Sequence, residues 1–212
     1  MITVTAFQWV PPFAQGVVRD MRVRWALEEA GLPYEARLLG QGEQGGPANR
    51  SVQPFGQVPA YEEDGLVMFE SGAIVLHIAE RAETLMPKDA QGRARAMTWV
   101  FAALNSIEIV AQDLAGMDLF HAGESWVTAR RPQVEARVKQ RLAELSIALG
   151  DRDYLEDRFT AGDLMMTTVL RILRDTDLVA QHPNLVAYQA RCQARPAFKR
   201  ALDAQMAPYG HA

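Results

Sequence analysis

Two short motifs in the first third of the chain have residue types suited to holding a small peptide. The first is Val58-Pro59, at the head of a predicted strand. Proline has no N–H to donate to a sheet ladder, so it belongs at a strand start or at an edge. A cis bond at Pro59 would turn the backbone N–H and C=O of Val58 sideways, where an extended peptide can pair with them as an added strand. The alternative is an ordinary trans proline in a loop.

The second motif, Glu70-Ser71, lies at the start of a predicted helix. A helix N-terminus offers unpaired N–H groups and a partial positive charge, which suit a carboxylate. The hydroxyl of Ser71 would add a donor, and Glu70 would hold an ammonium beside that carboxylate. The alternative is that Ser71 only caps its own helix. Gln57 could bind a second carboxylate or a backbone amide, so the two motifs together predict a site for a small acidic tripeptide.

The first eighty residues alternate between strand and helix patterns. Residues 2–7 alternate with period two, residues 18–30 carry one broad apolar stripe, and residues 34–39 form a second short strand. This order is a βαβ unit, which implies parallel strands. Asp64-Gly65 separates two further strands, 58–62 and 66–69, and is a strong hairpin signal. A helix from Ser71 completes the pattern, which predicts a four-stranded sheet with helices packed on it.

The pattern after residue 83 is helical only. Residues 84–90 form the candidate linker, and a helical domain follows at 91–212. The clearest helix start is Thr160, with Asp163 at the third helical position as a capping box. The helix it opens is apolar almost all round and is therefore expected at the centre of a bundle. The predicted helices cover 91–120, 132–149, 160–174, 183–194 and 197–206.

The composition of the chain argues against several kinds of partner, cross-link and cofactor. A net charge of −4 argues against nucleic acid or an anionic membrane as the main partner. The single cysteine, Cys192, excludes an internal disulfide and fits a reducing compartment. We see no signal peptide and no uninterrupted apolar stretch long enough to span a membrane, so we expect a cytoplasmic protein. The histidines show no metal-ligand spacing, and no metal is expected.

The segments Gln53-Pro-Phe-Gly-Gln-Val-Pro59 and Asp64-Gly-Leu-Val-Met-Phe-Glu-Ser-Gly-Ala-Ile74 resemble the glutathione-binding half of the cytosolic glutathione S-transferase family, as a bacterial-type member. Phe159-Thr-Ala-Gly-Asp-Leu-Met-Met166 resembles the start of that family's central helix. The resemblance implies an α/β thioredoxin-like domain at 1–83 and an all-α helical bundle. It further implies a homodimer, a role in detoxification, and glutathione as co-substrate in the cleft between the domains. Carried over by position, the glutathione contacts are Gln57, Val58, Glu70 and Ser71, with Pro59 as a structural cis-proline.

The sequence departs from the family where the glutathione thiol must be activated. A free thiol has a pKa near 8.5, and the family normally lowers it with a Tyr, Ser or Cys near the first helix. Residues 6–25 contain no Ser, Thr, Tyr or Cys. Pro11-Pro-Phe-Ala-Gln15 resembles the Cys-Pro-Phe-Ala-Gln segment of omega-type members, with Pro11 in place of the cysteine, which disfavours thiol-transfer chemistry. Gln15, Arg19 or backbone N–H groups at the first helix remain as candidates.

Three functions fit these residues. The first is an enzyme that conjugates the glutathione thiolate to a small hydrophobic electrophile; the family resemblance places Phe13, Asn105 and Glu108 in the electrophile pocket. The second is a non-catalytic protein of the same fold that binds ligands or partners. The third is a glutathione-dependent peroxidase or thiol oxidoreductase that uses no protein cysteine.

Overall fold

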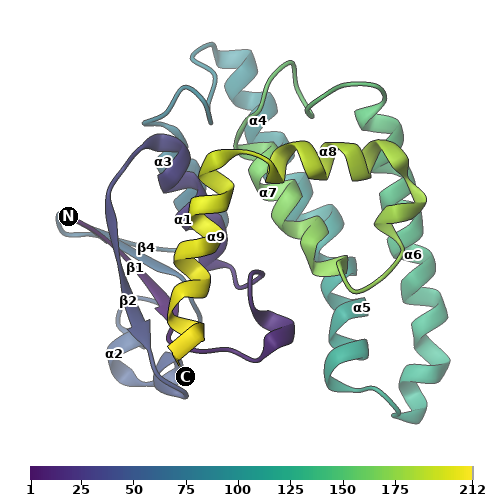
Figure 1. Ribbon diagram of the computed structural model, residues 1–212, viewed down its shortest axis with the longest axis horizontal. Coiled ribbons are helices and arrows are strands. Elements are labelled where there is room, and N and C mark those ends of the chain that lie inside the picture. The colour runs from purple at the N-terminus through teal and green to yellow at the C-terminus, as the bar shows by residue number, and fades with distance from the viewer. Residues whose placement is uncertain (212) are drawn as a thin grey trace. The chain divides into compact units, whose positions relative to one another are not determined.

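The computed structural model describes residues 1–211, and they form two compact units. The first unit combines Met1–Lys88 with the C-terminal segment that begins at Ala194 (Figure 1). The second unit is Asp89–Gln193. Each unit is built around its own set of buried apolar side chains.

The first unit contains a four-stranded mixed sheet in the order β2-β1-β3-β4. Its strands are β1 (Ile2–Phe7), β2 (Tyr34–Leu39), β3 (Ala60–Glu63) and β4 (Leu66–Phe69). β1 pairs parallel with β2 and antiparallel with β3, and β3 pairs antiparallel with β4. Asp64 and Gly65 both have positive φ, as the predicted tight hairpin turn requires. The sheet and its helices confirm the predicted thioredoxin-like α/β fold.

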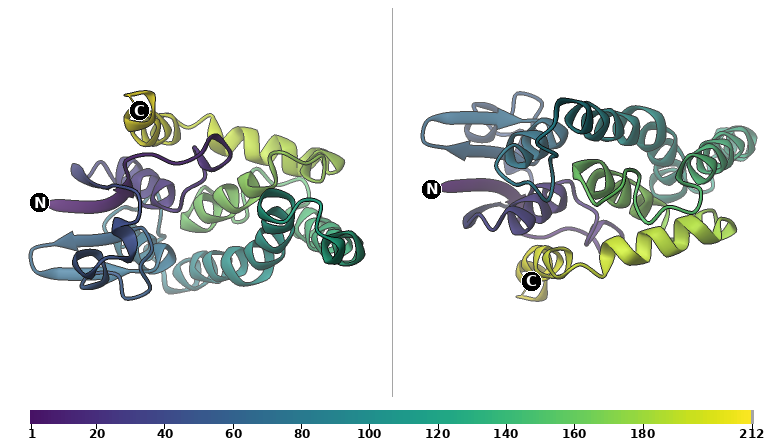
Figure 2. Two further views of the ribbon diagram at one scale, coloured as in Figure 1. Left: turned by 90° about the horizontal axis from the view of Figure 1, so that it is seen from below. Right: turned by 90° about the horizontal axis from the view of Figure 1, so that it is seen from above.

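The helices of this unit pack on the sheet and on one another. α1 contacts both α3 and α9, and Figures 1 and 2 show α9 lying beside α1. The indole of Trp25 meets the ring of Phe198 edge to face at 4.9 Å. Arg195 forms two hydrogen bonds with the carboxylate of Glu29, at 2.6 and 2.8 Å. The helices are α1 (Asp20–Ala30), α2 (Pro47–Arg50), α3 (Ser71–Ala79) and α9 (Pro196–Met206), with short 3-10 turns at Pro12–Ala14, Glu43–Gly45 and Ala207–His211.

The predicted domains and the observed units assign the last helix differently. The sequence assigns 91–212 to one helical domain, whereas α9 contacts α1 and groups with the first unit. The domain division around 84–90 stays a prediction.

The second unit is entirely helical, as predicted. All ten residues of α7 are buried, and Figure 2 shows this helix between α4 and α8. Its first turn carries the predicted capping box, in which Asp163 accepts the backbone N–H of Thr160 at 2.8 Å. The helices are α4 (Ala90–Ala102), a π-helical segment (Ala103–Glu108), α5 (Ile109–Phe120), α6 (Ser125–Leu149), α7 (Ala161–Leu170) and α8 (Pro183–Gln193), with 3-10 turns at Arg171–Leu173 and Val179–Gln181.

Gly162 explains how closely α7 approaches α4. A Cβ at this position would lie 2.5 Å from the Cβ of Trp99 and 3.3 Å from the carbonyl oxygen of Ala96. Both neighbours belong to α4, so any larger residue at 162 would push the two helices apart.

One continuous helical run, Ala90–Phe120, is long and apolar enough to cross a membrane by length and composition alone. Of its most apolar window, 44% is buried inside the structure. Because the run contacts α7 and α6, its apolar face serves the core of the second unit.

Candidate functional site

The pairing of β3 with β4 brings the two sequence motifs together. Ala60, the first residue of β3, lies opposite Phe69, the last residue of β4. Pro59 precedes Ala60 and Glu70 follows Phe69, so the antiparallel register makes Pro59 and Glu70 neighbours. The Val58–Pro59 peptide bond is cis. The register therefore places the predicted strand start and the predicted helix start next to each other.

A buried arginine lies beneath the second motif. Ser71, the first residue of α3, is 5% exposed, and its hydroxyl oxygen accepts a hydrogen bond from Nη1 of Arg22 at 3.2 Å. Arg22, on α1, is 3% exposed. A cation is thus fixed at the N-terminus of α3, where the helix already carries partial positive charge. Arg22 could not be predicted from the sequence, because nothing in its spacing connects it with residue 71.

Glu70 occupies an unusual backbone conformation. Its φ is 70° and its ψ is 108°, and its side chain is exposed. A non-glycine residue at positive φ costs free energy, and such residues concentrate at binding and catalytic sites. The side chain of Glu70 forms no capping bond to α3, and Ser71 lies inside the helix instead of before it. The two side chains of this motif are therefore not used to cap α3.

Buried amides fix the loop that leads to Val58. Nδ2 of Asn49 donates to the carbonyl oxygens of Gln44 and Gln57, at 2.9 and 3.0 Å. Oε1 of Gln53 accepts the backbone N–H groups of Phe55 and Gln57, at 2.8 and 3.1 Å. The backbone of Gln57 is thus held on both sides while its side chain stays exposed.

At the start of β3, a threonine side chain takes the place of a backbone carbonyl as hydrogen-bond acceptor. The backbone N–H of Ala60 donates to Oγ1 of Thr5, at 2.5 Å, and both residues are fully buried. Thr5 lies on β1, so this bond attaches the residue after Pro59 to the centre of the sheet.

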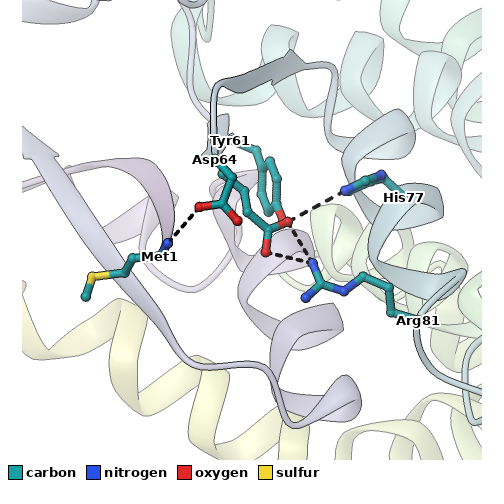
Figure 3. Close-up of polar contacts among 6 residues, drawn as sticks. Met1, Tyr61, Asp64, His77 and Arg81 are labelled. Atoms are coloured by element: carbon teal, nitrogen blue, oxygen red, sulfur yellow. Dashed lines mark hydrogen bonds and ion pairs between the residues drawn. The ribbon is translucent and has the colours of Figure 1, made fainter.

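A cluster around Glu63 holds the other end of α3 against the hairpin (Figure 3). The Glu63 carboxylate accepts hydrogen bonds from the hydroxyl of Tyr61 at 2.6 Å and from Nη1 of Arg81 at 2.7 and 2.9 Å. Nε2 of His77 lies 3.9 Å from the same carboxylate. The donors, Tyr61 first and then Arg81, lower the pKa of Glu63, while burial raises the pKa of Tyr61. In the same view the N-terminal amine of Met1 lies 3.4 Å from Oδ1 of Asp64.

The segment between β1 and α1 contains the predicted candidates for thiol activation. Nε2 of Gln15 donates to the carbonyl oxygen of Val10 at 3.2 Å, so its side chain braces this segment from within. Arg19 directly precedes α1 and is half-buried, and Phe13 is exposed. A cavity of about 500 Å³ lies beside the segment. Its lining residues are all uncharged and include Gln8, Trp9, Pro11, Leu38, Gln41 and Pro208.

The two remaining predicted residues belong to the second unit, in the π-helical segment. Asn105 is exposed. Glu108 is buried, and its Oε1 accepts a hydrogen bond from Nε2 of Gln112 at 3.0 Å. Within residues 1–211, no group of three or more His, Cys, Asp or Glu side chains is placed to hold a metal ion.

A thioredoxin-like sheet joined in one chain to an all-helical unit is the architecture of the glutathione S-transferase class. Family models support that class on both units. Residues 20–87 match the glutathione S-transferase N-terminal domain, and residues 94–196 match the glutathione S-transferase C-terminal domain. The chain belongs to the glutathione S-transferase family.

Individual relatives agree with this assignment. The chain is 31% identical to glutathione S-transferase F11 of Arabidopsis thaliana over 76% of its length and 80% of the relative. It is 29% identical to a glutathione S-transferase of Hyoscyamus muticus over 86% of its length and 92% of the relative. A crystal structure of a glutathione transferase from Burkholderia graminis, with two glutathione molecules bound per subunit, superimposes with a TM-score of 0.84 at 29% identity. That match covers 96% of this chain and 88% of the other.

Proposed function

We propose that this chain binds glutathione and transfers it to a small hydrophobic electrophile. The observation that carries the proposal is the β3–β4 register, which places Pro59 beside Glu70 at the start of α3. Family membership and the glutathione-bound relative support it.

The proposed binding mode uses each group of the tripeptide. The cysteinyl backbone pairs with the N–H and C=O of Val58. The γ-glutamyl carboxylate lies at the N-terminus of α3 and accepts the hydroxyl of Ser71, and the carboxylate of Glu70 takes the adjacent ammonium. The side-chain amide of Gln57 binds the second carboxylate or the neighbouring amide. Arg22 adds a buried positive charge behind Ser71.

Thiol activation is proposed to use the segment between β1 and α1. Residues 6–25 lack Ser, Thr, Tyr and Cys, and the side-chain amide of Gln15 donates to the carbonyl oxygen of Val10, so the proposed donors are backbone N–H groups or the guanidinium of Arg19. Lowering the thiol pKa supplies the nucleophile, and holding both substrates together supplies the remaining rate enhancement. Phe13, Asn105 and Glu108 are the proposed contacts of the electrophile.

The setting of the reaction is also a proposal. We expect a cytoplasmic homodimer that takes part in detoxification, with glutathione consumed as co-substrate and no metal required. A dimer is supported by the exposed aromatic pair of Phe55 and Phe69, whose rings meet edge to face with centroids 6.0 Å apart.

A specific observation favours a second candidate function. The missing hydroxyl or thiol in residues 6–25 is what a non-catalytic glutathione-binding protein would show. A glutathione-dependent peroxidase or oxidoreductase without a protein cysteine is the third candidate.

Two measurements separate these functions. Retention on immobilised glutathione tests binding, and conjugation of chlorodinitrobenzene and a broad panel of electrophiles tests transfer. We expect both retention and conjugation. Retention with no conjugation of any electrophile would refute the transferase and favour the non-catalytic protein, whereas turnover of a small disulfide or hydroperoxide alone would favour the third candidate.

A further inference from the structure

A single buried glutamine near the C-terminus bonds to both residues that flank Arg19. Gln205 lies in the last turn of α9 and is 1% exposed. Its Nε2 donates to the carbonyl oxygen of Val18 at 3.2 Å and to Oδ1 of Asp20 at 2.6 Å. One side chain from the end of the chain therefore spans the point where the β1–α1 segment becomes a helix.

Asp20 is fixed in turn by α1 itself. It is fully buried, and its Oδ2 accepts a hydrogen bond from Nε of Arg24 at 2.7 Å. Nη1 of Arg24 donates to the carbonyl oxygen of Ala204 at 3.3 Å, so the ion pair also contacts α9. Tyr34 on β2 and Tyr209 after α9 also interact electrostatically with this carboxylate.

Gln205 donates two hydrogen bonds but, within residues 1–211, leaves its own acceptor unsatisfied. Its Oε1 is buried without a hydrogen-bond partner among the described residues, and leaving a buried acceptor unsatisfied costs free energy. An apolar side chain of the same size would remove that unsatisfied acceptor, but it would also leave the carbonyl oxygen of Val18 and Oδ1 of Asp20 without this donor. The attachment of α9 to α1 is already supplied elsewhere, by the pairs Arg195–Glu29 and Arg200–Glu28. The further effect of Gln205 is to hold the backbone carbonyl of Val18 and the carboxylate of Asp20 in fixed positions relative to each other.

We propose that Gln205 is a positioning residue for thiol activation, which fixes the backbone around Arg19 through its bonds to Val18 and Asp20. This inference rests on the proposed function. Because residues 6–25 offer no hydroxyl or thiol, the proposed donors to the sulfur are the Arg19 guanidinium or backbone N–H groups. The local backbone sets the direction of those N–H groups and the point from which the Arg19 side chain extends. The end of α9 thereby supports a catalytic segment that lies far from it in the sequence.

The test is the pKa of the glutathione thiol in its complex with the full-length protein, measured by titrating the ultraviolet absorbance of the thiolate. Gln205→Met keeps the size and the charge of the side chain but removes both N–H donors. We expect it to retain glutathione while the thiol pKa rises by about one unit, which lowers the thiolate fraction about tenfold at any pH well below both pKa values. Arg195→Met is the matched control, because it weakens the attachment of α9 without touching Val18 or Asp20.

The outcomes separate the two proposals. If the wild-type protein retains no glutathione, or does not lower the thiol pKa, the proposed function fails and the inference fails with it. If the wild-type protein lowers the thiol pKa and Gln205→Met lowers it equally, only the inference is overturned. Equal shifts in Gln205→Met and Arg195→Met would show a general structural role and would overturn it as well. Faster amide hydrogen exchange in residues 12–19 of Gln205→Met, but not of Arg195→Met, would provide independent support.

Discussion

Nη1 of Arg22 donates to the hydroxyl oxygen of Ser71 across 3.2 Å, and both side chains are buried. The bond joins the first turn of α1 to the first turn of α3. It also orients the Ser71 hydroxyl. Because the hydroxyl oxygen accepts a hydrogen bond from Arg22, the hydroxyl proton points away from Arg22 and can be donated to a ligand. The proposed position for a ligand carboxylate therefore has a donor and a cation arranged before any ligand arrives, which lowers the entropy cost of binding.

Ser71→Ala tests this arrangement directly. Removing one hydrogen bond to a charged group costs about 1.5–3 kcal/mol, so we expect glutathione to bind about 10- to 150-fold more weakly. Isothermal titration calorimetry on the purified protein measures the change. Ser51→Ala is the control, because Ser51 is exposed and its hydroxyl donates only to the carbonyl oxygen of Ala48. Equal affinity in Ser71→Ala and wild type would remove Ser71 from the site.

A pair of substitutions at Glu70 separates backbone strain from ligand binding. Glu70→Ala keeps a Cβ at positive φ, whereas Glu70→Gly does not. We expect Glu70→Gly to be more stable than Glu70→Ala by about 1 kcal/mol, the lower end of the cost of a left-handed backbone for a residue with a side chain.

Both Glu70 variants lose the carboxylate, so both should bind glutathione more weakly to the same extent. Urea denaturation and calorimetry give the two quantities separately. A glycine variant that is less stable than the alanine variant would show that the positive φ at this position carries no strain.

Thr5→Val removes the hydroxyl that accepts the backbone N–H of Ala60. Valine has nearly the same shape, but the buried N–H is left without its partner, at a cost of about 1–3 kcal/mol. The residue after Pro59 loses its attachment to β1, so glutathione affinity should fall together with the melting temperature. Thr98→Val is the control, because this exposed hydroxyl donates to its own helix at Ala94. If both variants melt alike, the Thr5 bond contributes nothing.

Local sequence patterns predicted the elements that carry the site. Asp64-Gly65 specified the hairpin, and the apolar period after Ser71 specified α3. The predicted start of the helix 132–149 was wrong, because α6 begins at Ser125 and continues through Pro132. The predicted helix 91–120 contains a π-helical segment at Ala103–Glu108, which no apolar period reveals.

The partners of the site residues could not be predicted from the sequence. Arg22 meets Ser71 only because α1 and α3 pack together. Gln205 meets Val18 and Asp20 only because the last helix packs against the first. These contacts join residues far apart in the chain, and neither partner belongs to a periodic pattern. Propensity and hydrophobic period describe neighbours along the chain, so they carry no information about such pairs.

The exposed aromatic pair near the site provides a test of the proposed homodimer. Phe55 is 63% exposed and its ring meets that of Phe69, which is 37% exposed, so the two form a contiguous exposed apolar patch. If a second copy covers it, Phe55→Asp should weaken the dimer at least tenfold in sedimentation equilibrium. Phe120→Asp, at a similarly exposed position in the second unit, is the comparison. A monomeric wild-type protein would contradict the proposal, as would a Phe55→Asp dimer of unchanged affinity.

The hydrogen bonds around Glu63 predict how the free energy of unfolding depends on pH. Hydrogen bonds from Tyr61 and Arg81 hold the pKa of Glu63 below its ordinary value of 4.5. Since the folded pKa lies below the unfolded one, the stabilisation is complete above pH 4.5 and is lost as the pH falls through the lowered value. Glu63→Gln should therefore reduce the free energy of unfolding by about 1 kcal/mol near neutral pH, and by less as the pH falls below 4.5. Denaturant titrations of both proteins over that range measure the difference. Protonation removes the charge of Glu63, so a contribution from that charge must disappear at strongly acidic pH. If the difference in free energy of unfolding between the two proteins stays constant down to that pH, the charge of Glu63 does not stabilise the fold.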